Sequence, residues 1–286
     1  MKLCKIILAL AAIPVISLCA VWLEGIELTK AAPQKVGELP PDLKGSSVQF
    51  QSGSGAMIRG WFLPGQRGSG AVALMHGVRS NRCSMLDRAR FLSHVGYAVL
   101  LFDFQAHGES EGSHITFGSL ESKDAQAAIQ FLRSNAPGEK IGVVGVSMGG
   151  AAAVLATPRL DVDALVIEMV YPTIDEAVNN RLTMRLGHWS RVFTPLLELE
   201  LRTRLGISAN DLRPIDHVGG LTTPKLFIVG SKDIHTTLEE SQRLYDTASD
   251  PKEFWIIQGA AHVDLHNAAK TEYEHRLLEF FSKHLR

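Results

Sequence analysis

One five-residue stretch combines a nucleophilic side chain with the small residues that expose it. Residues 145–149 read G-V-S-M-G and lie between the apolar run 140–146 and the small-residue run 150–156. A G-x-S-x-G motif between a buried strand and a helix predicts a sharp turn that lifts the serine hydroxyl from the edge of a sheet. Both glycines are needed because side chains there would collide with the neighbouring strand and helix. A tight structural turn is the alternative, but the flanking elements favour Ser147 as a nucleophile.

Two later loops supply the histidine and the acid that a catalytic serine needs. The apolar run 224–229 is followed by Asp233, and the run 253–257 leads to His262. Both loops follow predicted strands, at the carboxyl edge where open α/β sheets carry their sites. We expect His262 to take the proton from Ser147 and Asp233 to fix the imidazole tautomer and stabilise the imidazolium.

Two other histidines and two other acids lie close enough in sequence to be alternatives to His262 and Asp233: His235, His266, Asp216 and Asp264. His266 lies one helical turn beyond His262 and is expected to begin or cap the last helix, whereas His235 could line the pocket. Asp264 is too near His262 in sequence to orient it across the sheet, and Asp216 precedes a strand instead of following one. Both acids are therefore expected to be surface or capping residues.

Two backbone N–H groups are needed to stabilise an oxyanion. The first is expected from Met148, which follows the nucleophile and opens a helix whose unpaired N–H groups and positive dipole end face the site. The second is expected from Val78, because the strand 71–75 runs into His76 and Gly77, and glycine lets the backbone turn its amide toward the site. A histidine that ends a buried strand before glycine is expected to be a structural hydrogen-bonder.

Together these motifs resemble the α/β-hydrolase superfamily, and the resemblance covers about residues 46–286. It rests on His76-Gly77, the stretch Asp103-Phe104-Gln105-Ala106-His107-Gly108-Glu109-Ser110, the 145–149 motif, Asp233 and His262. More narrowly, the chain is similar to exported or membrane-anchored bacterial serine hydrolases of the esterase-like and serine-aminopeptidase-like kind. The resemblance implies an α/β fold with a mostly parallel, twisted sheet covered by helices on both faces. The order serine, acid, histidine along the chain agrees with it.

The resemblance also implies roles for single residues. The catalytic set is Ser147, Asp233 and His262, with oxyanion donors at Val78 and Met148. In this superfamily the 103–110 stretch is a structural loop, so Asp103 and His107 are expected to belong to the scaffold. Gln105 departs from the pattern, because relatives often carry arginine there; this departure affects nothing catalytic.

Alternating apolar runs and helical patterns agree with this fold class. We expect a hairpin over 47–50 and 57–64, strands over 97–103 and 165–170, and helices over 82–94 and 120–135. An insertion over 171–214 has apolar residues at helical spacing and is expected to form a small helical cap above the nucleophile; packing at the sheet edge is the alternative. Its arginines could bind a substrate carboxylate, but a solvated helix face is the favoured interpretation: Arg181, Arg185, Arg191, Arg202 and Arg204.

Composition limits the remaining possibilities. At 286 residues and 45% hydrophobic, the chain can bury one large core. A net charge of −1 gives no electrostatic case for a nucleic-acid partner. Phosphate-binding, dinucleotide-binding and zinc motifs are absent from the sequence, so we expect no cofactor and no metal. Cys83 is the one cysteine outside the leader, so no disulfide is expected within the domain.

The N-terminus predicts an export signal. Lys2 and Lys5 precede the uncharged run 6–23, and Glu24 and Glu27 follow it. This asymmetry is typical of a segment whose N-terminal end stays in the cytoplasm. The cleavage signals around Ala20 are poor, so an uncleaved anchor is favoured over a removed signal peptide.

The expected organisation is therefore an anchor or signal peptide over 1–28, a linker over 29–45 and a catalytic domain over 46–286. The domain would lie outside the cytoplasmic membrane, tethered to it, or in the periplasm or medium after cleavage.

The expected activity is a serine hydrolase that cleaves carboxylic esters with short to medium acyl chains. Three alternatives use the same residues or fold: a peptidase or amidase, an acyltransferase or perhydrolase, and a binding protein with negligible turnover. The sequence leaves the choice between ester and amide substrates open, and it leaves the oligomeric state open.

Overall fold

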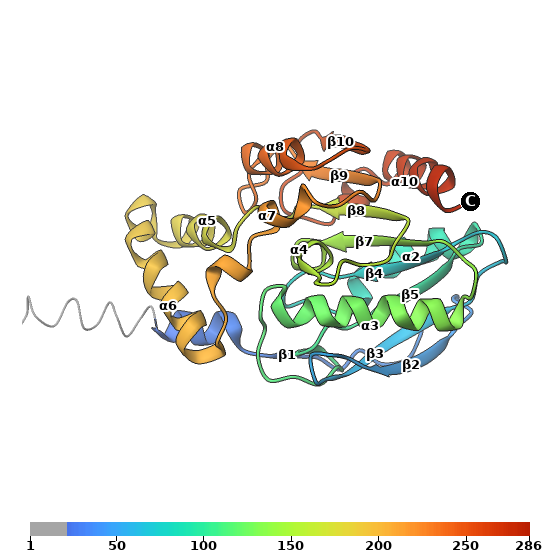
Figure 1. Cartoon of the computed structure of the whole chain (residues 1–286), viewed down its shortest axis with the longest axis horizontal. Coiled ribbons are helices and arrows are strands. Elements are labelled where there is room, and N and C mark those ends of the chain that lie inside the picture. Colours follow the sequence, from blue (N-terminus) through green and yellow to red (C-terminus); the bar gives the residue numbers. More distant parts are fainter. Residues whose placement is uncertain (1–21) are drawn as a thin grey trace, which may run out of the picture.

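The computed structural model describes residues 22–286, which fold around one eight-stranded sheet (Figure 1). The strand order is β10-β9-β8-β7-β4-β5-β3-β2. All neighbouring pairs are parallel except β2 with β3 and β3 with β5. The strands are β2 (Ser46–Gln51), β3 (Met57–Leu63), β4 (Ala71–Met75), β5 (Ala98–Phe102), β7 (Ile141–Val146), β8 (Ala164–Glu168), β9 (Lys225–Gly230) and β10 (Lys252–Ile257).

The central strands are apolar on both faces because helices cover both. In β4, Ala71, Ala73 and Met75 belong to one hydrophobic cluster, while Val72 and Leu74 belong to the other. This alternation with a period of two assigns successive side chains to opposite faces of the sheet. The continuous apolar runs seen in the sequence are thus the mark of a sheet buried on both sides.

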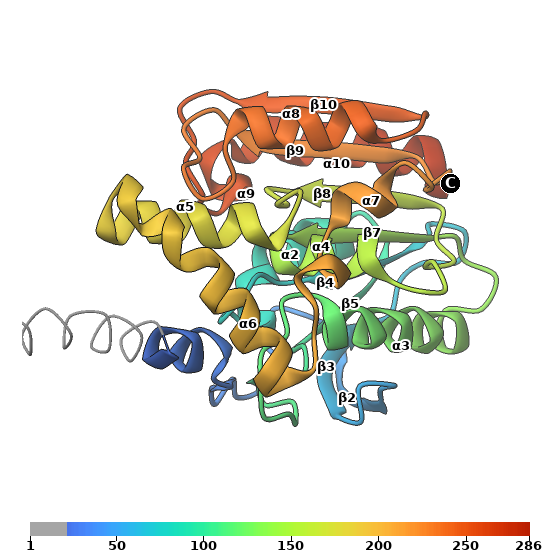
Figure 2. The same ribbon diagram turned by 60° about the vertical axis from the view of Figure 1, so that its left-hand side comes forward.

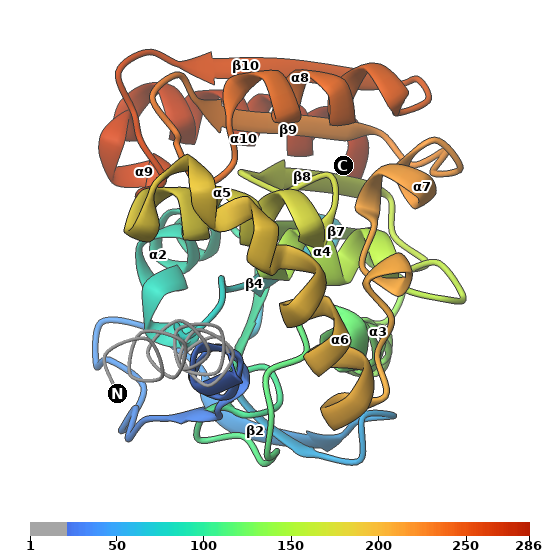
Figure 3. The same cartoon turned by 90° about the vertical axis from the view of Figure 1, so that its left-hand side faces the viewer.

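Two layers of helices enclose the sheet. In Figure 3, which views the molecule from the end occupied by α5 and α6, α2 and α10 lie on one side of the sheet and α3 and α4 on the other. The helices are α2 (Leu86–His94), α3 (Ser119–Asn135), α4 (Met148–Leu155), α5 (Ile174–Leu186), α6 (Thr194–Leu205), α7 (Pro214–Val218), α8 (Leu238–Thr247), α9 (Leu265–Ala268) and α10 (Lys270–Leu285). The architecture is the α/β-hydrolase fold that the motifs predicted. The expected helix over 82–94 differs in its first turn, which is a 3-10 helix over Arg82–Met85 followed by α2.

The 171–214 insertion forms α5 and α6, joined by a 3-10 turn over His188–Phe193. Figures 1 and 2 show both helices beyond the arrowheads of β7 and β8, at the carboxyl edge of the sheet. A short helix over residues 22–29 lies beside α6 in the same views. These three helices surround the region into which the central strands point.

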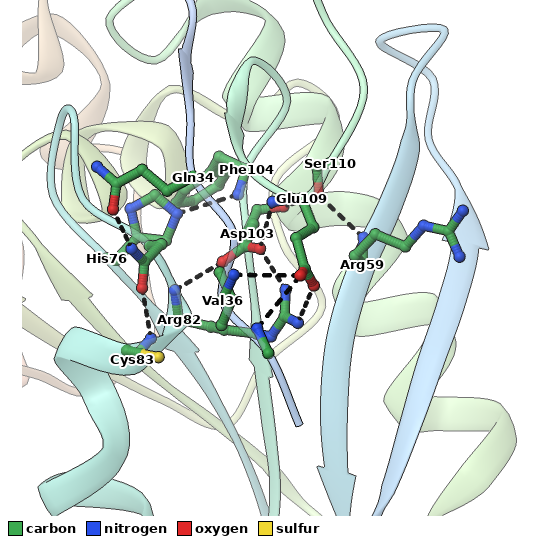
Figure 4. A network of polar contacts seen from close by, with 12 residues as sticks. Gln34, Val36, Arg59, His76, Arg82, Cys83, Asp103, Phe104, Glu109 and Ser110 are labelled. Carbon is green, nitrogen blue, oxygen red and sulfur yellow. Dashed lines mark hydrogen bonds and ion pairs between the residues drawn. The ribbon is translucent and has the colours of Figure 1, made fainter. Parts of the chain in front are cut away.

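The 29–45 segment, expected to be a linker, is packed against the domain instead. Its strand β1 (Ala32–Pro33) pairs in parallel with β6 (His107–Gly108). The backbone N–H of Val36 donates to the carboxylate of Glu109 across 3.1 Å, a contact drawn in Figure 4. Proline and charge in this stretch suggested a free spacer, but its main-chain hydrogen bonds are made with the loop after β5.

The expected anchor over 1–28 falls largely outside the described residues. Its last part, from residue 22 onward, belongs to the helix over 22–29. Within residues 22–286, none of the helices combines the length and the apolar character needed to span a bilayer.

Candidate active site

Ser147 occupies the turn between β7 and α4 in a conformation that serine rarely adopts. Its backbone has φ 50° and ψ −115°, and positive φ is uncommon for a residue with a Cβ. The backbone N–H of Ser147 donates to the carbonyl of Glu168 in β8 across 2.7 Å, which fixes the turn against the neighbouring strand. Such local strain persists only where the surroundings hold it in place, and it is common at active sites.

The two glycines of the motif are required by their neighbours, as the sequence predicted. A Cβ on Gly145 would lie 2.5 Å from the Cα of Gly150 in α4. A Cβ on Gly149 would lie 2.5 Å from the carbonyl oxygen of Met75, at the end of β4. Both contacts are with backbone, which cannot move aside, so the helix can approach the sheet this closely only with glycine at both positions.

The structure brings Asp233 and His262 together from the loops after β9 and β10. Oδ2 of Asp233 lies 2.7 Å from Nδ1 of His262. Oδ1 of Asp233 accepts the backbone N–H groups of His235 and Thr236 at 2.8 and 2.9 Å. A carboxylate held by three donors has a fixed orientation, so it assigns the proton of His262 to Nδ1 and leaves Nε2 as the acceptor.

Backbone contacts join the two loops that carry this pair. The N–H of Lys232 donates to the carbonyl of Ala260 across 2.8 Å, and the N–H of Gly259 donates to Oγ of Ser231 across 2.8 Å. A Cβ on Gly230 would lie 2.4 Å from the same Ala260 oxygen. The loops at the carboxyl ends of β9 and β10 therefore hold the acid and the histidine next to each other.

Ser147 lies at the centre of the sheet, where the chain leaves β4 toward β5 on one side and later returns to β7 on the other. Such a switch point opens a crevice outside the carboxyl ends of the strands. Within residues 22–286, no hydrogen bond joins Oγ of Ser147 to His262. Serine–histidine hydrogen bonds in enzymes without substrate are often long and tighten when substrate binds.

A buried charge network lies behind the serine turn, and no local sequence pattern indicates it. Arg88 of α2 is 2% exposed and contacts the carboxylate of Glu168 at 2.8 Å. It also contacts Asp264 at 2.9 Å and the hydroxyl of Tyr273 at 2.9 Å. Asp264 caps α9 by accepting the N–H of His266, as expected of a capping residue. Arg88 thus links the strand that holds the serine turn to the loop that follows His262.

His76 makes the structural hydrogen bonds expected of it. Its Nδ1 donates to the carbonyl of Gly77 across 2.7 Å, and its Nε2 accepts the N–H of Phe104 across 3.1 Å. Burial lowers the pKa of His76 to about 3, so the ring stays neutral, and this agrees with one donor and one acceptor nitrogen. Because C=O and N–H point in opposite directions across a trans peptide, the same hydrogen bond turns the N–H of Val78 away from His76.

The candidate oxyanion donors border the same space as the serine. Val78 and Met148 line one cavity together with Ser147. Met148 is the first residue of α4, where a helix has no internal acceptor for its N–H. In residues 22–286 neither N–H donates to another backbone group, which leaves both available to an oxyanion.

The loop after β5 belongs to the scaffold around the candidate active site, as expected, and does not line the cavity. Asp103 pairs with the buried guanidinium of Arg82, and Arg82 also contacts Glu109 (Figure 4). The hydroxyl of Ser110 donates to the carbonyl of Asp103, and Nδ1 of His107 bonds the carbonyl of Gln105. All of these contacts lie inside the scaffold.

Gln105 contacts two acids of α3, and within residues 22–286 neither of them forms an ion pair with a lysine or an arginine. The side chain of Gln105 donates to Glu121 across 2.8 Å, and its backbone N–H donates to Asp124 across 2.8 Å. Asp124 also accepts the hydroxyls of Ser52 and Ser54. Burial raises the pKa of Asp124 to about 7 despite these hydrogen bonds.

A cavity of about 180 Å³ lies in front of Ser147. Its walls come from the helix over 22–29, from α5 and from α6, and most of the lining side chains are apolar: Leu28, Ile174, Val178, Leu182, Leu197 and Leu201. The insertion therefore lies over the serine, as a cap, and is not extra packing at the sheet edge. The contribution of residues 24–29 to the wall was not foreseen from the sequence.

Charged residues border this cavity as well. Four arginines and two glutamates line it: Arg79, Arg181, Arg185, Arg204, Glu24 and Glu200. Arg191 and Arg202 are exposed, as expected of a solvated helix face. The expectation is wrong for Arg181 and Arg204, which are half-buried in the cavity wall. Arg185 borders the cavity, but its side chain is 60% exposed, as expected of a solvated face.

The competing residues lie elsewhere. Asp216 is exposed and pairs with Arg213 on the surface. His266 is buried in α9, with Nε2 at 2.9 Å from Glu274. The ring of His235 lies 5.0 Å from that of His262, centroid to centroid, although His235 does not line the cavity.

Among residues 22–286, no cluster of three or more histidine, cysteine or acidic side chains is arranged to hold a metal ion. Cys83, on the first turn after the oxyanion loop, is a free thiol.

Comparison with known proteins agrees with this fold. A family model described as serine aminopeptidase, S33, matches residues 66–212. The uncharacterized protein YqkD of Bacillus subtilis is 25% identical over 235 residues, which cover 80% of this chain and 76% of that protein. Lysophosphatidylserine lipase ABHD12 of Danio rerio is 27% identical over 170 residues, covering 57% of this chain and 42% of its own length.

Solved structures give the same picture. The Pyrococcus furiosus esterase Pf2001, in one crystal form, aligns with a TM-score of 0.73 and 25% identity, covering 90% of this chain and 97% of the esterase. An esterase from Exiguobacterium antarcticum aligns with a TM-score of 0.62 and 14% identity over 83% of this chain, a likeness of fold alone.

Proposed function

The chain belongs to the hydrolase family described as serine aminopeptidase, S33, and on that premise we propose that it cleaves carboxylic esters through an acyl-enzyme on Ser147. One observation carries the proposal. A strained serine turn lies at the carboxyl edge of the sheet that also carries a hydrogen-bonded Asp233–His262 pair, and it opens into a largely apolar cavity.

The mechanism follows from the groups present. Nε2 of His262 removes the proton from Ser147 while Oγ attacks the ester carbonyl, and Asp233 stabilises the imidazolium that forms. The N–H groups of Val78 and Met148 stabilise the negative charge on the carbonyl oxygen. The imidazolium then protonates the leaving alcohol, and water hydrolyses the acyl-enzyme by the same steps in reverse order.

The charges around the cavity favour an ester over an aminopeptidase substrate. An aminopeptidase must bind a protonated amino group close to the scissile bond. Four arginines line the cavity; three of them pair with glutamates, and the charge of the remaining one, Arg181, would repel such a cation. Burial also raises the pKa of Glu200 to about 7, so this carboxylate is only partly ionised at neutral pH. An ester with an apolar acyl chain meets no such penalty.

We also propose that the N-terminal segment tethers the domain to the outer side of the cytoplasmic membrane. The sequence asymmetry around residues 6–23 supports this proposal. So do exposed apolar side chains on the helix that follows residue 21 and on the turn between α5 and α6: Trp22, Leu23, Trp189 and Val192. Fractionation of cells should recover the full-length chain in membranes and accessible to external protease; full-length protein in the cytoplasm would contradict export.

The proposed activity is tested with the nucleophile. Hydrolysis of p-nitrophenyl butyrate by the wild type should be lost in Ser147→Ala, with kcat lower by about 10⁵-fold or more. A fluorophosphonate probe should label the wild type and not the variant. Aminoacyl p-nitroanilides, assayed alongside, report on the peptidase alternative. Faster cleavage of the anilides than of the esters would contradict the ester assignment, and full activity in the variant would contradict the nucleophile.

A further inference from the structure

Arg181 of α5 is a cationic side chain in the cavity wall without a carboxylate partner. It is half-buried, and its Nη1 donates to the carbonyl of Ala177, one helical turn earlier, across 3.2 Å. Within residues 22–286, no aspartate or glutamate lies within ion-pair distance of Arg181. Residues 1–21 contain neither acid, so they cannot supply the missing partner.

The other arginines of the cavity are all paired. The pairs are Arg79 with Glu27 at 3.5 Å, Arg204 with Glu200 at 3.7 Å, and Arg185 with Glu24. The two glutamates that line the cavity are thereby neutralised by partners other than Arg181. Arg181 is therefore the arginine of the cavity wall that has no carboxylate partner among the described residues, and partial protonation of Glu200 adds to the positive charge around it.

The groups that face Arg181 do not neutralise its charge. Burial lowers the pKa of Arg181, and the neighbouring Arg185 lowers it further, whereas Tyr171 and Asp233 raise it. Arginine stays protonated in proteins, so the side chain remains a cation at every working pH. Asp233 is engaged by His262 and by two backbone N–H groups, so it is not a free counter-ion. A half-buried cation without a counter-ion is costly, and an anion bound there would recover that cost.

The lining of the cavity indicates which part of the substrate it holds. Val78 and Met148, the oxyanion donors, line it, but His262 does not. The leaving group must contact His262 to be protonated, so the leaving alcohol lies outside the cavity and the acyl chain lies inside. A group that meets Arg181 is thus carried by the acyl chain.

We propose that Arg181 binds a carboxylate at the far end of the acyl chain, so that the preferred substrates are monoesters of dicarboxylic acids. This inference rests on the proposed function. A carboxylate matches the single unpaired charge, and a guanidinium can bind it through two parallel hydrogen bonds. The apolar side chains that line the same cavity would contact the methylene groups of the diacid.

The test compares two esters of similar length, monoethyl adipate and ethyl heptanoate, by their kcat/KM ratio. The wild type should favour the charged ester by about 10- to 100-fold, the range of a charge-assisted hydrogen-bonded pair. Arg181→Met should bring the ratio close to one, and Arg181→Lys should keep part of the preference. Arg202→Met, which removes an exposed arginine of α6 outside the cavity lining, is the matched control and should keep the wild-type ratio.

The outcomes separate this inference from the activity on which it rests. Hydrolysis of ethyl heptanoate without a preference for monoethyl adipate would overturn the carboxylate site and leave the esterase intact. A preference that survives in Arg181→Met would also overturn it. Failure to hydrolyse either ester would overturn the proposed function, and the inference with it.

Discussion

The backbone N–H of Ser147 donates to the carbonyl of Glu168 across 2.7 Å, and the side chain of the same Glu168 is held by Arg88 across 2.8 Å. The strained turn of the nucleophile is thus tied to a buried ion pair on the opposite side of β8. Both charged side chains are almost fully buried, at 0% and 2% exposed. The pair thus joins α2 to β8, the strand to which the turn of Ser147 is hydrogen-bonded.

Arg88→Met should therefore destabilise the domain strongly. It leaves the carboxylate of Glu168 buried without a cation, which costs about 3–5 kcal/mol, a large part of the stability of an ordinary domain. Urea unfolding measures this loss. The double variant Arg88→Met/Glu168→Gln removes both charges and should recover much of it. Equal stability of Arg88→Met and the wild type would show that the ion pair does not hold β8 in place.

The orientation of His262 should depend on the charge of Asp233. Asp233→Asn keeps the size of the side chain but presents an amide in place of the carboxylate, so the imidazole settles in the wrong tautomer. We expect kcat for p-nitrophenyl butyrate to fall by roughly 10³- to 10⁴-fold with the fold retained. Asp216→Asn, on the surface, should be unaffected and serves as control. Normal turnover in Asp233→Asn would mean that another acid orients His262, with Asp175 and Glu176 after β8 as the next candidates.

Local sequence patterns predict part of this site. The serine turn, Asp233 and His262 could be predicted because each lies directly after an apolar strand. The turn residues that expose them are neighbours in sequence. Parallel strands align their carboxyl ends, so strand positions alone bring the three loops to one edge. The glycines at 145 and 149 were predicted for the same reason, since their steric requirement belongs to the turn itself.

Contacts between distant segments could not be predicted in this way. Arg88 and Glu168 are separated by 80 residues, and nothing near either one indicates its partner. The apolar run 6–23 predicts an anchor over residues 1–28, yet Glu24 and Leu28 of the helix over 22–29 line the cavity. Arg181 was assigned to a solvated face because the charges of α5 suggest one. Which face of α5 is covered depends on α6 and the N-terminal helix, and periodicity alone does not specify those neighbours.

Asp124 should make the stability of the domain depend on pH. Its pKa is raised from about 3.8 to about 7 by burial, so between these values the folded state holds a proton that the unfolded state has lost. The stability that Asp124 contributes is therefore fully present below about pH 4. It declines by about 4 kcal/mol as the pH rises through 7.

Asp124→Asn should remove this decline, because its amide can donate to the hydroxyls of Ser52 and Ser54 without ionising. The difference between the free energies of unfolding at pH 5 and at pH 8, measured in urea, should be smaller in the variant than in the wild type. Asp161→Asn changes a side chain that is 90% exposed and should leave the pH dependence unchanged. If the free energy of unfolding changes equally between pH 5 and pH 8 in the wild type and in Asp124→Asn, Asp124 is already ionised in the folded state at pH 5.

The cap should set the length of the acyl chain that the enzyme prefers. Each methylene transferred from water to the apolar wall contributes about 0.8 kcal/mol, so kcat/KM should rise about fourfold per carbon until the cavity is full. Val178→Phe fills part of the wall formed by α5 and should shift the optimum toward shorter chains, with acetyl ester hydrolysis little changed. Leu199→Phe adds the same ring at an exposed position of α6 outside the cavity and should keep the wild-type profile. A series of p-nitrophenyl esters from acetate to decanoate measures the three profiles. If the wild-type profile is flat, the acyl chain does not enter the space between Ser147 and the cap.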